Sequence, residues 1–446
     1  MKGTIIMKKA KKLISTLLVT CIIFGFMAAC SKDVITNPTD PTKATDSTEA
    51  TDSTEATDPT EATDPTEATD PTIEFGTDAA AFDQVDFIVE VDSDRDPVIL
   101  QLTDTQIIDS SQDPYDTFVA VLDEFLGSDK MDERCFDYIR ETVDATKPDL
   151  ILITGDLVYG RFDSSGSSLL ALINCMEELE VPWAPVFGNH DNESAVGVDW
   201  QCQQLENAEH CLFKQRTLTG NGNYTVGIKQ GDDLKRVFFM MDSNGCASAS
   251  EASKTNGQWK GTAGFGEDQI AWYTDTAQRI KSQSPNTKFT FAFHIQITAF
   301  ANAYAKYGFT NGKTMNNPIN IDQLPSKAKG DFGYIGRDLK GPWDMEGTVL
   351  AGFKLLEVDS ILVGHEHCIS ASVVYDGIRF QFGQKSSEYD RYNSIHADGS
   401  IGNAYSTPTG MPTEGQIPLL GGTVMPLSKE DGSIKEPYIY LCENVD

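Results

Sequence analysis

The sequence predicts a layered α/β fold for the part of the chain that begins near residue 73. Short apolar runs alternate there with segments in which apolar residues recur at helical spacing. Six of these runs are followed closely by Asp, Asn or His. Layered α/β folds place their ligand sites just beyond the carboxyl ends of their strands. We therefore expect these polar residues to converge at one site.

The first two predicted strands enclose a predicted helix. Residues 98–102 are an apolar run of strand length, and Asp104 follows them. Apolar side chains then recur every three to four residues, which predicts a helix that ends before Pro148. Residues 150–153 form the next apolar run and lead into Asp156. A second helix is expected across Leu169 to Met176, before the third strand.

The remaining predicted strands follow the same rule. Each has an apolar run of four to six residues with polar residues directly behind it. The runs and the residues behind them are 183–187 before Asn189 and His190, 237–241 before Asp242, 288–293 before His294, and 360–363 before His365 and His367. A last strand is expected at 438–442.

The use of histidine sharpens this prediction. The chain has six histidines, and four of them lie at these strand ends. A single histidine after a strand is more often structural than a ligand. Four of them beside Asp104, Asp156 and Asn189 favour a metal site, and imidazole with carboxylate suits Mn, Fe or Zn.

These residues form an ordered set of motifs. The set resembles that of the calcineurin-like metallophosphoesterases, and its purple-acid-phosphatase-like branch in particular. The motifs are Asp104-x-Gln106, Gly155-Asp156, Gly188-Asn189-His190-Asp191, His294 and Gly364-His365-x-His367. The resemblance implies a four-layer α/β/β/α sandwich of two mixed β-sheets flanked by helices.

The resemblance also implies a role for each residue. Asp156 would bridge two metal ions. Asp104 and His367 would bind the first ion, and a second set of ligands would bind the other. That second set is Asn189, His294 and His365. His190 would not be a ligand; it would face the phosphate and assist the leaving-group oxygen.

Hydrolysis of a phosphate ester at neutral pH explains the need for such a site. Two divalent or trivalent ions can bind and deprotonate a water between them and neutralise the phosphoryl oxygens. A carboxylate such as Asp156 has two oxygens and a negative charge, which suits a bridge. An imidazole such as His190 can donate a proton near pH 7.

The sequence departs from the family at Gln106, where a histidine is usual. Glutamine can bind a metal only through a neutral carbonyl oxygen. Purple acid phosphatases lack that histidine and use a tyrosine in the order Gly-Asp-x-x-Tyr, which Tyr159 matches here. Two alternatives stay open: Tyr159 binds an Fe(III) ion, or it packs beside the ligands while Gln106 or water fills the site.

Two further residues are candidates for substrate binding. Asn223 could line the substrate mouth, although a turn explains it almost as well. Lys385 could help to hold an anionic substrate, although a solvated lysine is the simpler interpretation. The segments around 197–260 and 300–345 are long for bare connections, and we expect them to form the rim that selects substrate.

The first 72 residues predict an export signal and a tether. Residues 1–29 have a lysine-rich start and an apolar stretch that ends in small residues, as in a secretory signal peptide. The sequence Met27-Ala28-Ala29-Cys30 resembles a bacterial lipoprotein box, which implies lipidation at Cys30. Residues 30–72 are dominated by an acidic Thr/Glu/Ala/Asp/Pro repeat that cannot bury enough apolar surface to fold. The metallophosphoesterase domain is then 73–446.

Composition narrows the set of partners. The net charge of −32 argues against a nucleic-acid-binding protein, because such proteins hold phosphates with basic residues. The cysteines are scattered, and Cys202 with Cys211 is the one close pair suited to a disulfide. We expect a small phosphorylated substrate and attachment to the outer side of a bacterial membrane, at the cell surface, through the N-terminal lipid.

The predicted function is metal-dependent hydrolysis of phosphate esters outside the cytoplasm. A phosphodiesterase or nucleotidase acting on nucleotides or lipid head groups is the alternative within the enzyme class. A surface protein that binds phosphate ligands and has weakened turnover is the alternative outside it. The motifs fit a monoesterase and a diesterase equally, and they leave the metal pair and the oligomeric state open.

Overall fold

A computed structural model of the chain describes residues 82–108, 128–160, 163–245, 263–310, 318–336, 341–389, 391–396, 399–405 and 417–443. The predicted signal peptide, the tether and Cys30 lie outside these ranges. Of the helices within them, none is long and apolar enough to cross a membrane.

A five-stranded sheet contains the first three predicted strands. Its order is β17-β16-β2-β3-β4. The strands β2, β3 and β4 run parallel, and β16 and β17 join them in antiparallel fashion. Their bounds are β2 Val98–Leu102, β3 Leu150–Thr154, β4 Trp183–Val186, β16 Gly421–Pro426 and β17 Tyr438–Leu441. The predicted last strand at 438–442 is confirmed in β17.

A nine-stranded mixed sheet forms the second layer, in the order β1-β5-β6-β7-β10-β12-β11-β9-β8. Its strands are β1 Phe87–Glu90, β5 Tyr224–Gln230, β6 Asp233–Met240, β7 Lys288–Ala292, β10 Val358–Val363, β12 Ile378–Phe382, β11 Ile369–Tyr375, β9 Phe332–Ile335 and β8 Ile319–Asn320. A smaller third sheet pairs β13 (Arg391–Ile395) with β14 (Ile401–Tyr405) and β15 (Ile417–Pro418). This third sheet was not predicted from the sequence.

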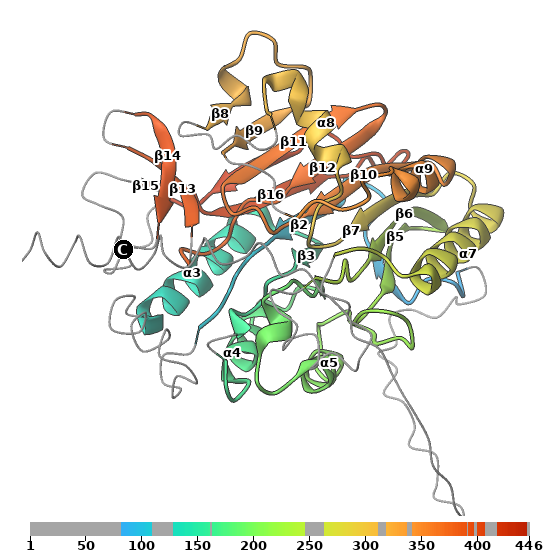
Figure 1. Cartoon of the computed structure of the whole chain (residues 1–446). Helices are drawn as coiled ribbons and strands as arrows, with labels where there is room; N and C mark the ends of the chain where they lie inside the picture. Colours follow the sequence, from blue (N-terminus) through green and yellow to red (C-terminus); the bar gives the residue numbers. More distant parts are fainter. Residues whose placement is uncertain are drawn as a thin grey trace, which may run out of the picture. The chain divides into compact units, whose positions relative to one another are not determined.

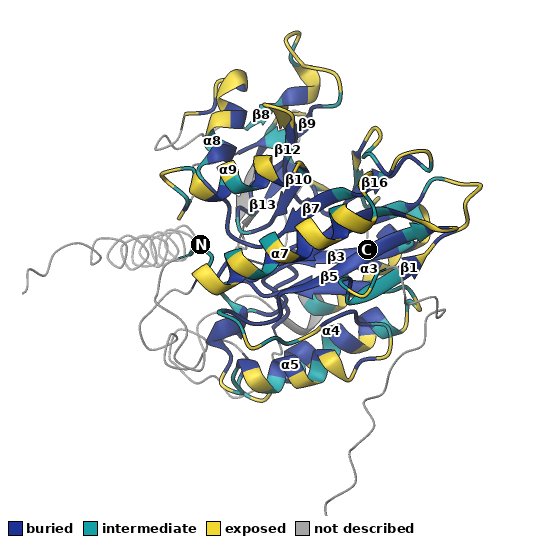
Figure 2. Cartoon of the chain, turned by 90° about the vertical axis from the view of Figure 1, so that its right-hand side faces the viewer, coloured by how far each residue is buried: buried dark blue, intermediate teal, exposed yellow. Residues whose placement is uncertain are grey.

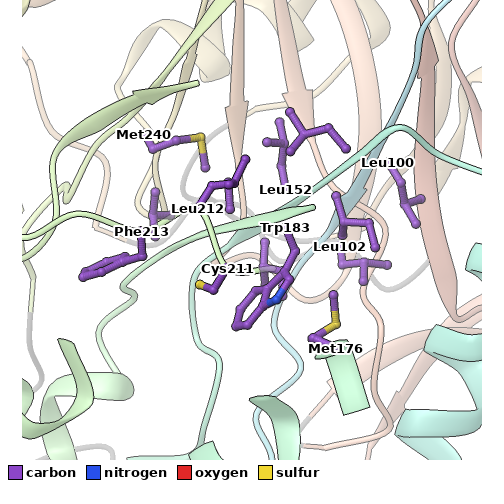
Figure 3. Close-up of a cluster of buried hydrophobic side chains, with 14 of the residues drawn as sticks. Leu100, Leu102, Leu152, Met176, Trp183, Cys211, Leu212, Phe213 and Met240 are labelled. Atoms are coloured by element: carbon purple, nitrogen blue, oxygen red, sulfur yellow. The ribbon is translucent and has the colours of Figure 1, made fainter. Parts of the chain in front are cut away.

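Strand β6 shows how the two large sheets pack, because successive side chains of a strand point to opposite faces. Phe238 and Met240 belong to the apolar cluster that includes the strands of the five-stranded sheet. Val237 and Phe239 belong to the cluster on the other face. Figure 3 shows Met240 in the same cluster as Leu152 of β3. The main core therefore lies between the two sheets.

Helices cover the outer faces of both sheets (Figure 1). Residues of α3 (Ser128–Thr146), α4 (Ser167–Glu177) and α5 (Val198–Glu206) pack in the cluster of the five-stranded sheet. Residues of α7 (Glu267–Gln283), α8 (Ala299–Tyr304) and α9 (Thr348–Leu355) pack against the nine-stranded sheet. The helices expose one face and bury the other (Figure 2). The predicted mixed α/β fold, with its four layers, is confirmed.

The structure corrects one prediction of detail and answers one open question. The segment around 197–260 is not only a rim, because it contributes β5 and β6, which pair along their whole length across a two-residue turn at Gly231. Such a hairpin needs no long connection. Cys202 and Cys211, the close pair suited to a disulfide, are not bonded: both thiols are free, and Cys202 Sγ lies 3.6 Å from Gln215 Oε1.

Candidate metal centre

The polar residues behind the strands converge at one place. Two groups of side chains have ligand atoms that all lie within 4.8 Å of one another, and both groups contain Asp156. The groups are Asp156 with His294 and His365, and Asp104 with Asp156 and His367. Asp104, Asp156 and His294 are buried, and His365 and His367 are partly exposed. The shared carboxylate has the position that a bridging ligand requires.

The backbone around Asp156 is adapted to this crowding. Asp156 itself has a φ of 52° and Gly155 a φ of 92°, both in the left-handed region. A Cβ at Gly155 would lie 2.5 Å from His294 Nδ1, and one at Gly188 would lie 2.2 Å from Asp156 Oδ1. These two positions therefore need glycine. The backbone N–H of His190 donates to Asp156 Oδ1 at 2.8 Å and holds the carboxylate in place.

His294 is held in the tautomer that a metal requires. Its Nδ1 lies 2.8 Å from the carbonyl oxygen of Thr154, which can only accept, so Nδ1 bears the proton. In the neutral ring, Nε2 then presents its lone pair, and it lies 3.2 Å from Asp156 Oδ2. Two ligand atoms about 2.1 Å from a common metal are typically about 3 Å apart. The spacing fits that arrangement.

Unsatisfied buried atoms test whether a metal fits here. Among the described residues, Asp156 Oδ2, Asn189 Oδ1 and His294 Nε2 are buried without a hydrogen-bond partner. Each of these atoms presents a lone pair, and a buried lone pair without a partner is costly. A cation would satisfy Asp156 Oδ2 and His294 Nε2, which lie 3.2 Å apart, and the amide oxygen of Asn189 is a suitable further ligand. The residues present therefore fit a metal centre.

Asp104 anchors the other ligand group. Its Oδ2 accepts a hydrogen bond from Thr103 Oγ1 at 2.7 Å, and its Oδ1 lies 3.3 Å from His367 Nε2. Burial acts to raise the pKa of Asp104, but the hydrogen bond and charge of His367 outweigh it and lower the pKa to about 2. Asp104 is therefore an anion at neutral pH, as a metal ligand should be.

His190 lies beside these groups and is oriented by a carboxylate. Its Nδ1 lies 2.7 Å from Glu193 Oε2, and Glu193 is buried. The ring of Tyr159 packs against the His190 ring at a tilt of 31°, with a centroid distance of 4.1 Å. Glu193 was not predicted from the sequence. The i,i+3 spacing across the short 3₁₀ turn Asp191–Glu193 was the available signal.

Asp191 is a second residue that sequence reasoning did not place. Its two carboxylate oxygens accept from the backbone N–H groups of Val158 at 3.0 Å and Gly188 at 2.7 Å. These groups belong to the two loops that carry Asp156 and Asn189. Asp191 therefore links both loops through hydrogen bonds.

Gln106 and Lys385 form a buried pair. Lys385 is 1% exposed, so it is not a solvated lysine, and its Nζ donates to Gln106 Oε1 at 2.8 Å and to the Asp104 carbonyl at 3.0 Å. The carbonyl oxygen of Gln106, the only atom through which it could bind a metal, is thus engaged by Lys385.

Asn223 does not line an open mouth. It is 1% exposed, and its Oδ1 accepts from the Asp242 backbone at 3.1 Å and from Gln269 Nε2 at 2.8 Å. Its Nδ2 donates to the Thr219 carbonyl at 3.1 Å. Its φ of 67° marks a turn, which was the alternative interpretation. Asn223 therefore closes the 219–223 turn, and a role in substrate binding is not supported.

Comparison with known proteins agrees with this geometry. The profile of the family described as calcineurin-like phosphoesterase matches residues 97–369. The probable inactive purple acid phosphatase 28 of Arabidopsis thaliana is 31% identical over 185 residues, which cover 36% of this chain and 44% of that protein. Phosphatase DCR2 of Saccharomyces cerevisiae is 24% identical over 258 residues, which cover 54% of this chain and 39% of that protein. The chain thus spans less than half the length of these two relatives.

Solved structures were compared as well. A dimetal phosphatase from Danio rerio aligns with 74% of this chain and 95% of its own, at 11% identity and a TM-score of 0.40. A purple acid phosphatase from yellow lupin seeds aligns with 78% of this chain and 54% of its own, at 12% identity and a TM-score of 0.34. Because the family profile matches more than half of this chain, the chain belongs to the calcineurin-like phosphoesterase family.

Proposed function

We propose that this protein hydrolyses phosphate esters with a two-metal centre bridged by Asp156. The observation that supports this most directly is the pair of ligand groups that share Asp156. Asp104, Asp156 and His367 would hold the first ion. Asp156, Asn189, His294 and His365 would hold the second.

Two such ions would neutralise charge on the phosphoryl oxygens and lower the pKa of a water between them. The side chains of this protein divide the remaining work. Asp191 and the His190 backbone N–H keep the bridging carboxylate and its loops fixed. Pre-positioning of this kind avoids reorganisation during the reaction.

His190 would donate a proton to the leaving-group oxygen. Because Glu193 Oε2 lies 2.7 Å from Nδ1, this carboxylate stabilises a protonated ring. The ring of Tyr159, packed against it at 4.1 Å between centroids, limits rotation of the imidazole. His190 is thus fixed in orientation without being a metal ligand.

Two other functions compete with this one. A diesterase acting on nucleotides or lipid head groups would use the same centre. A phosphate-binding protein with weakened turnover would agree with the word "inactive" in the names of some relatives. The two ligand groups that share Asp156 and the His190–Glu193 pair favour turnover.

The test is hydrolysis of p-nitrophenyl phosphate and bis-p-nitrophenyl phosphate by the full chain loaded with Mn, Fe or Zn. His190→Ala should lower kcat by roughly 10²–10⁴-fold, the usual contribution of general acid catalysis. His210→Ala is the matched control, because His210 also pairs with a glutamate, Glu177, but lies outside the centre. A wild-type chain that binds metal and turns over neither ester, nor a wider panel of phosphate esters, would favour the binding protein.

We also propose that the chain works outside the cytoplasm, anchored through Cys30. The basis is the signal-like start and the lipoprotein-like box. Labelled palmitate should be incorporated into the wild-type chain expressed in a bacterium and not into Cys30→Ser. Equal labelling of both chains would overturn the anchor.

A further inference from the structure

The pair formed by Gln106 and Lys385 determines what the first metal position can bind. This inference rests on the proposed two-metal function. Gln106 follows Asp104 by two residues, and its backbone N–H donates to the Asp156 carbonyl at 2.9 Å. Its side chain is wholly buried. It therefore lies against the loop that carries the bridging carboxylate.

Lys385 fixes the orientation of the Gln106 amide. An ammonium group can only donate, and Nζ is buried, so it needs acceptors. Its acceptors here include Gln106 Oε1 at 2.8 Å and the Asp104 carbonyl at 3.0 Å. If the amide flipped, Nε2 would face Nζ and set two donors against each other. The oxygen end of the amide therefore stays on Lys385.

The nitrogen end of the Gln106 amide is left to donate hydrogen bonds. Gln106 Nε2 is buried, and no partner for it exists among the described residues. An amide nitrogen has no lone pair to offer to a metal, but it can donate two hydrogen bonds. It is suited to an oxygen, either of a water or of a phosphoryl group.

We propose that Lys385 keeps Gln106 out of the metal coordination sphere and that Tyr159, whose ring packs against His190, is not a ligand either. The first metal position then keeps three protein ligands and binds its ion more weakly than the second. The Gln106 N–H donates to the water or phosphoryl oxygen that completes this position. The three ligands are Asp104, Asp156 and His367; the second position has four.

Metal titration of the full chain tests the first part. After chelation, Mn²⁺ alone is added and heat is measured. The wild type should show two classes of site that differ in affinity by about tenfold or more, since ligand number sets affinity. Gln106→Leu should change neither class by more than about threefold. Two equal classes in the wild type, or loss of the weaker class in Gln106→Leu, would overturn the proposal.

A variant that adds a metal ligand at the first position provides the complementary test. Gln106→His combined with Lys385→Met offers an imidazole and removes the cation that faces it. The weaker class should tighten by about tenfold in this double variant. Circular dichroism confirms that each variant folds. A folded double variant whose weaker class is unchanged would contradict the assignment.

Binding of inorganic phosphate to the Mn²⁺-saturated chain tests the donor role. Gln106→Leu should raise the phosphate Kd by about tenfold, the usual effect of losing one hydrogen bond to an anion. An unchanged Kd would exclude the donor role. Neither readout depends on turnover. An inactive chain whose two classes of metal site differ in affinity would therefore refute the hydrolase proposal and support this inference. An active chain whose two classes have equal affinity would support the hydrolase proposal and refute this inference.

Discussion

The Nδ1 atom of His294 lies 2.8 Å from the carbonyl oxygen of Thr154, the last residue of β3. This contact sets the tautomer of the imidazole and turns Nε2 toward Asp156 Oδ2, 3.2 Å away. The end of one strand thus orients the ligand delivered by another, β7. Carbonyl oxygens commonly fix metal-binding histidines in this way.

Gly155→Ala should displace His294. A Cβ at this position would lie 2.5 Å from His294 Nδ1, in a backbone with a φ of 92°. Gly308→Ala is the matched control, because its φ is 86° but nothing lies within 4 Å of the added carbon. We expect both variants to lose about 1–2 kcal/mol of unfolding free energy from backbone strain. Only Gly155→Ala should also lose metal affinity; equal affinity in the two variants would show that His294 is not crowded there.

Glu193→Gln should lower kcat by roughly 10–100-fold, the usual effect of removing a residue that orients a catalytic group. The physical reason is the 2.7 Å contact of Glu193 Oε2 with His190 Nδ1. The KM for p-nitrophenyl phosphate should change far less than kcat. Glu177→Gln alters the equivalent contact to His210, 3.1 Å long and outside the centre, and should leave kcat as it is. A kcat that is the same in both variants would remove Glu193 from the mechanism.

Asp242 should make stability fall as pH rises. Burial raises the pKa of Asp242 to about 6 in the folded chain, against about 3.9 in an unfolded chain. Between these values the folded state binds the extra proton, so the free energy of unfolding decreases with pH by at most about 1.4 kcal/mol per unit. Asp242→Asn should lack this decline. Urea unfolding at pH 4.5 and 6.5 measures it, and equal pH slopes for the two chains would refute the shift.

The Arg236–Asp359 pair should stabilise the fold strongly. Arg236 is wholly buried; its Nη1 lies 2.6 Å from Asp359 Oδ1, and its Nη2 lies 2.8 Å from Oδ2. Arg236→Met should cost about 3 kcal/mol of unfolding free energy, because it leaves a partly buried carboxylate without its partner. Arg279→Met removes an exposed pair with Asp275 and should cost about 0.5 kcal/mol or less. Equal losses in denaturant unfolding would contradict the difference in burial.

The ends of the strands could be predicted because they depend on local sequence, namely where an apolar run stops and polar residues begin. Runs such as 150–153 are wholly apolar, and β3 is buried along its whole length. The polar residues behind the strands could likewise be placed, since parallel strands end at one edge of a sheet. The β5–β6 hairpin was only partly predicted, because residues 237–241 were predicted as a strand while the residues of β5 were assigned to the rim.

The features that the sequence did not predict depend on contacts between residues far apart in the chain. Lys385 looks like a surface lysine in sequence, and its burial depends on the Asp104 carbonyl, 281 residues away. Asn223 looks like a loop residue, but Asp242 and Gln269 take up its amide. No local pattern reveals such partners. Glu193 was the exception, since its spacing from His190 lies within one turn.

The central claim is that Asp156 serves both metal positions, and metal affinity tests it most directly. Asp156→Asn introduces a residue type that tolerates the φ of 52° at this position, but it removes the negative charge of the bridging carboxylate. His367→Ala removes a ligand from one group only. Calorimetric titration with Mn²⁺ should show both classes of site weakened by about tenfold or more in Asp156→Asn, and one class weakened in His367→Ala. If Asp156→Asn weakens a single class, or none, Asp156 is not the bridge.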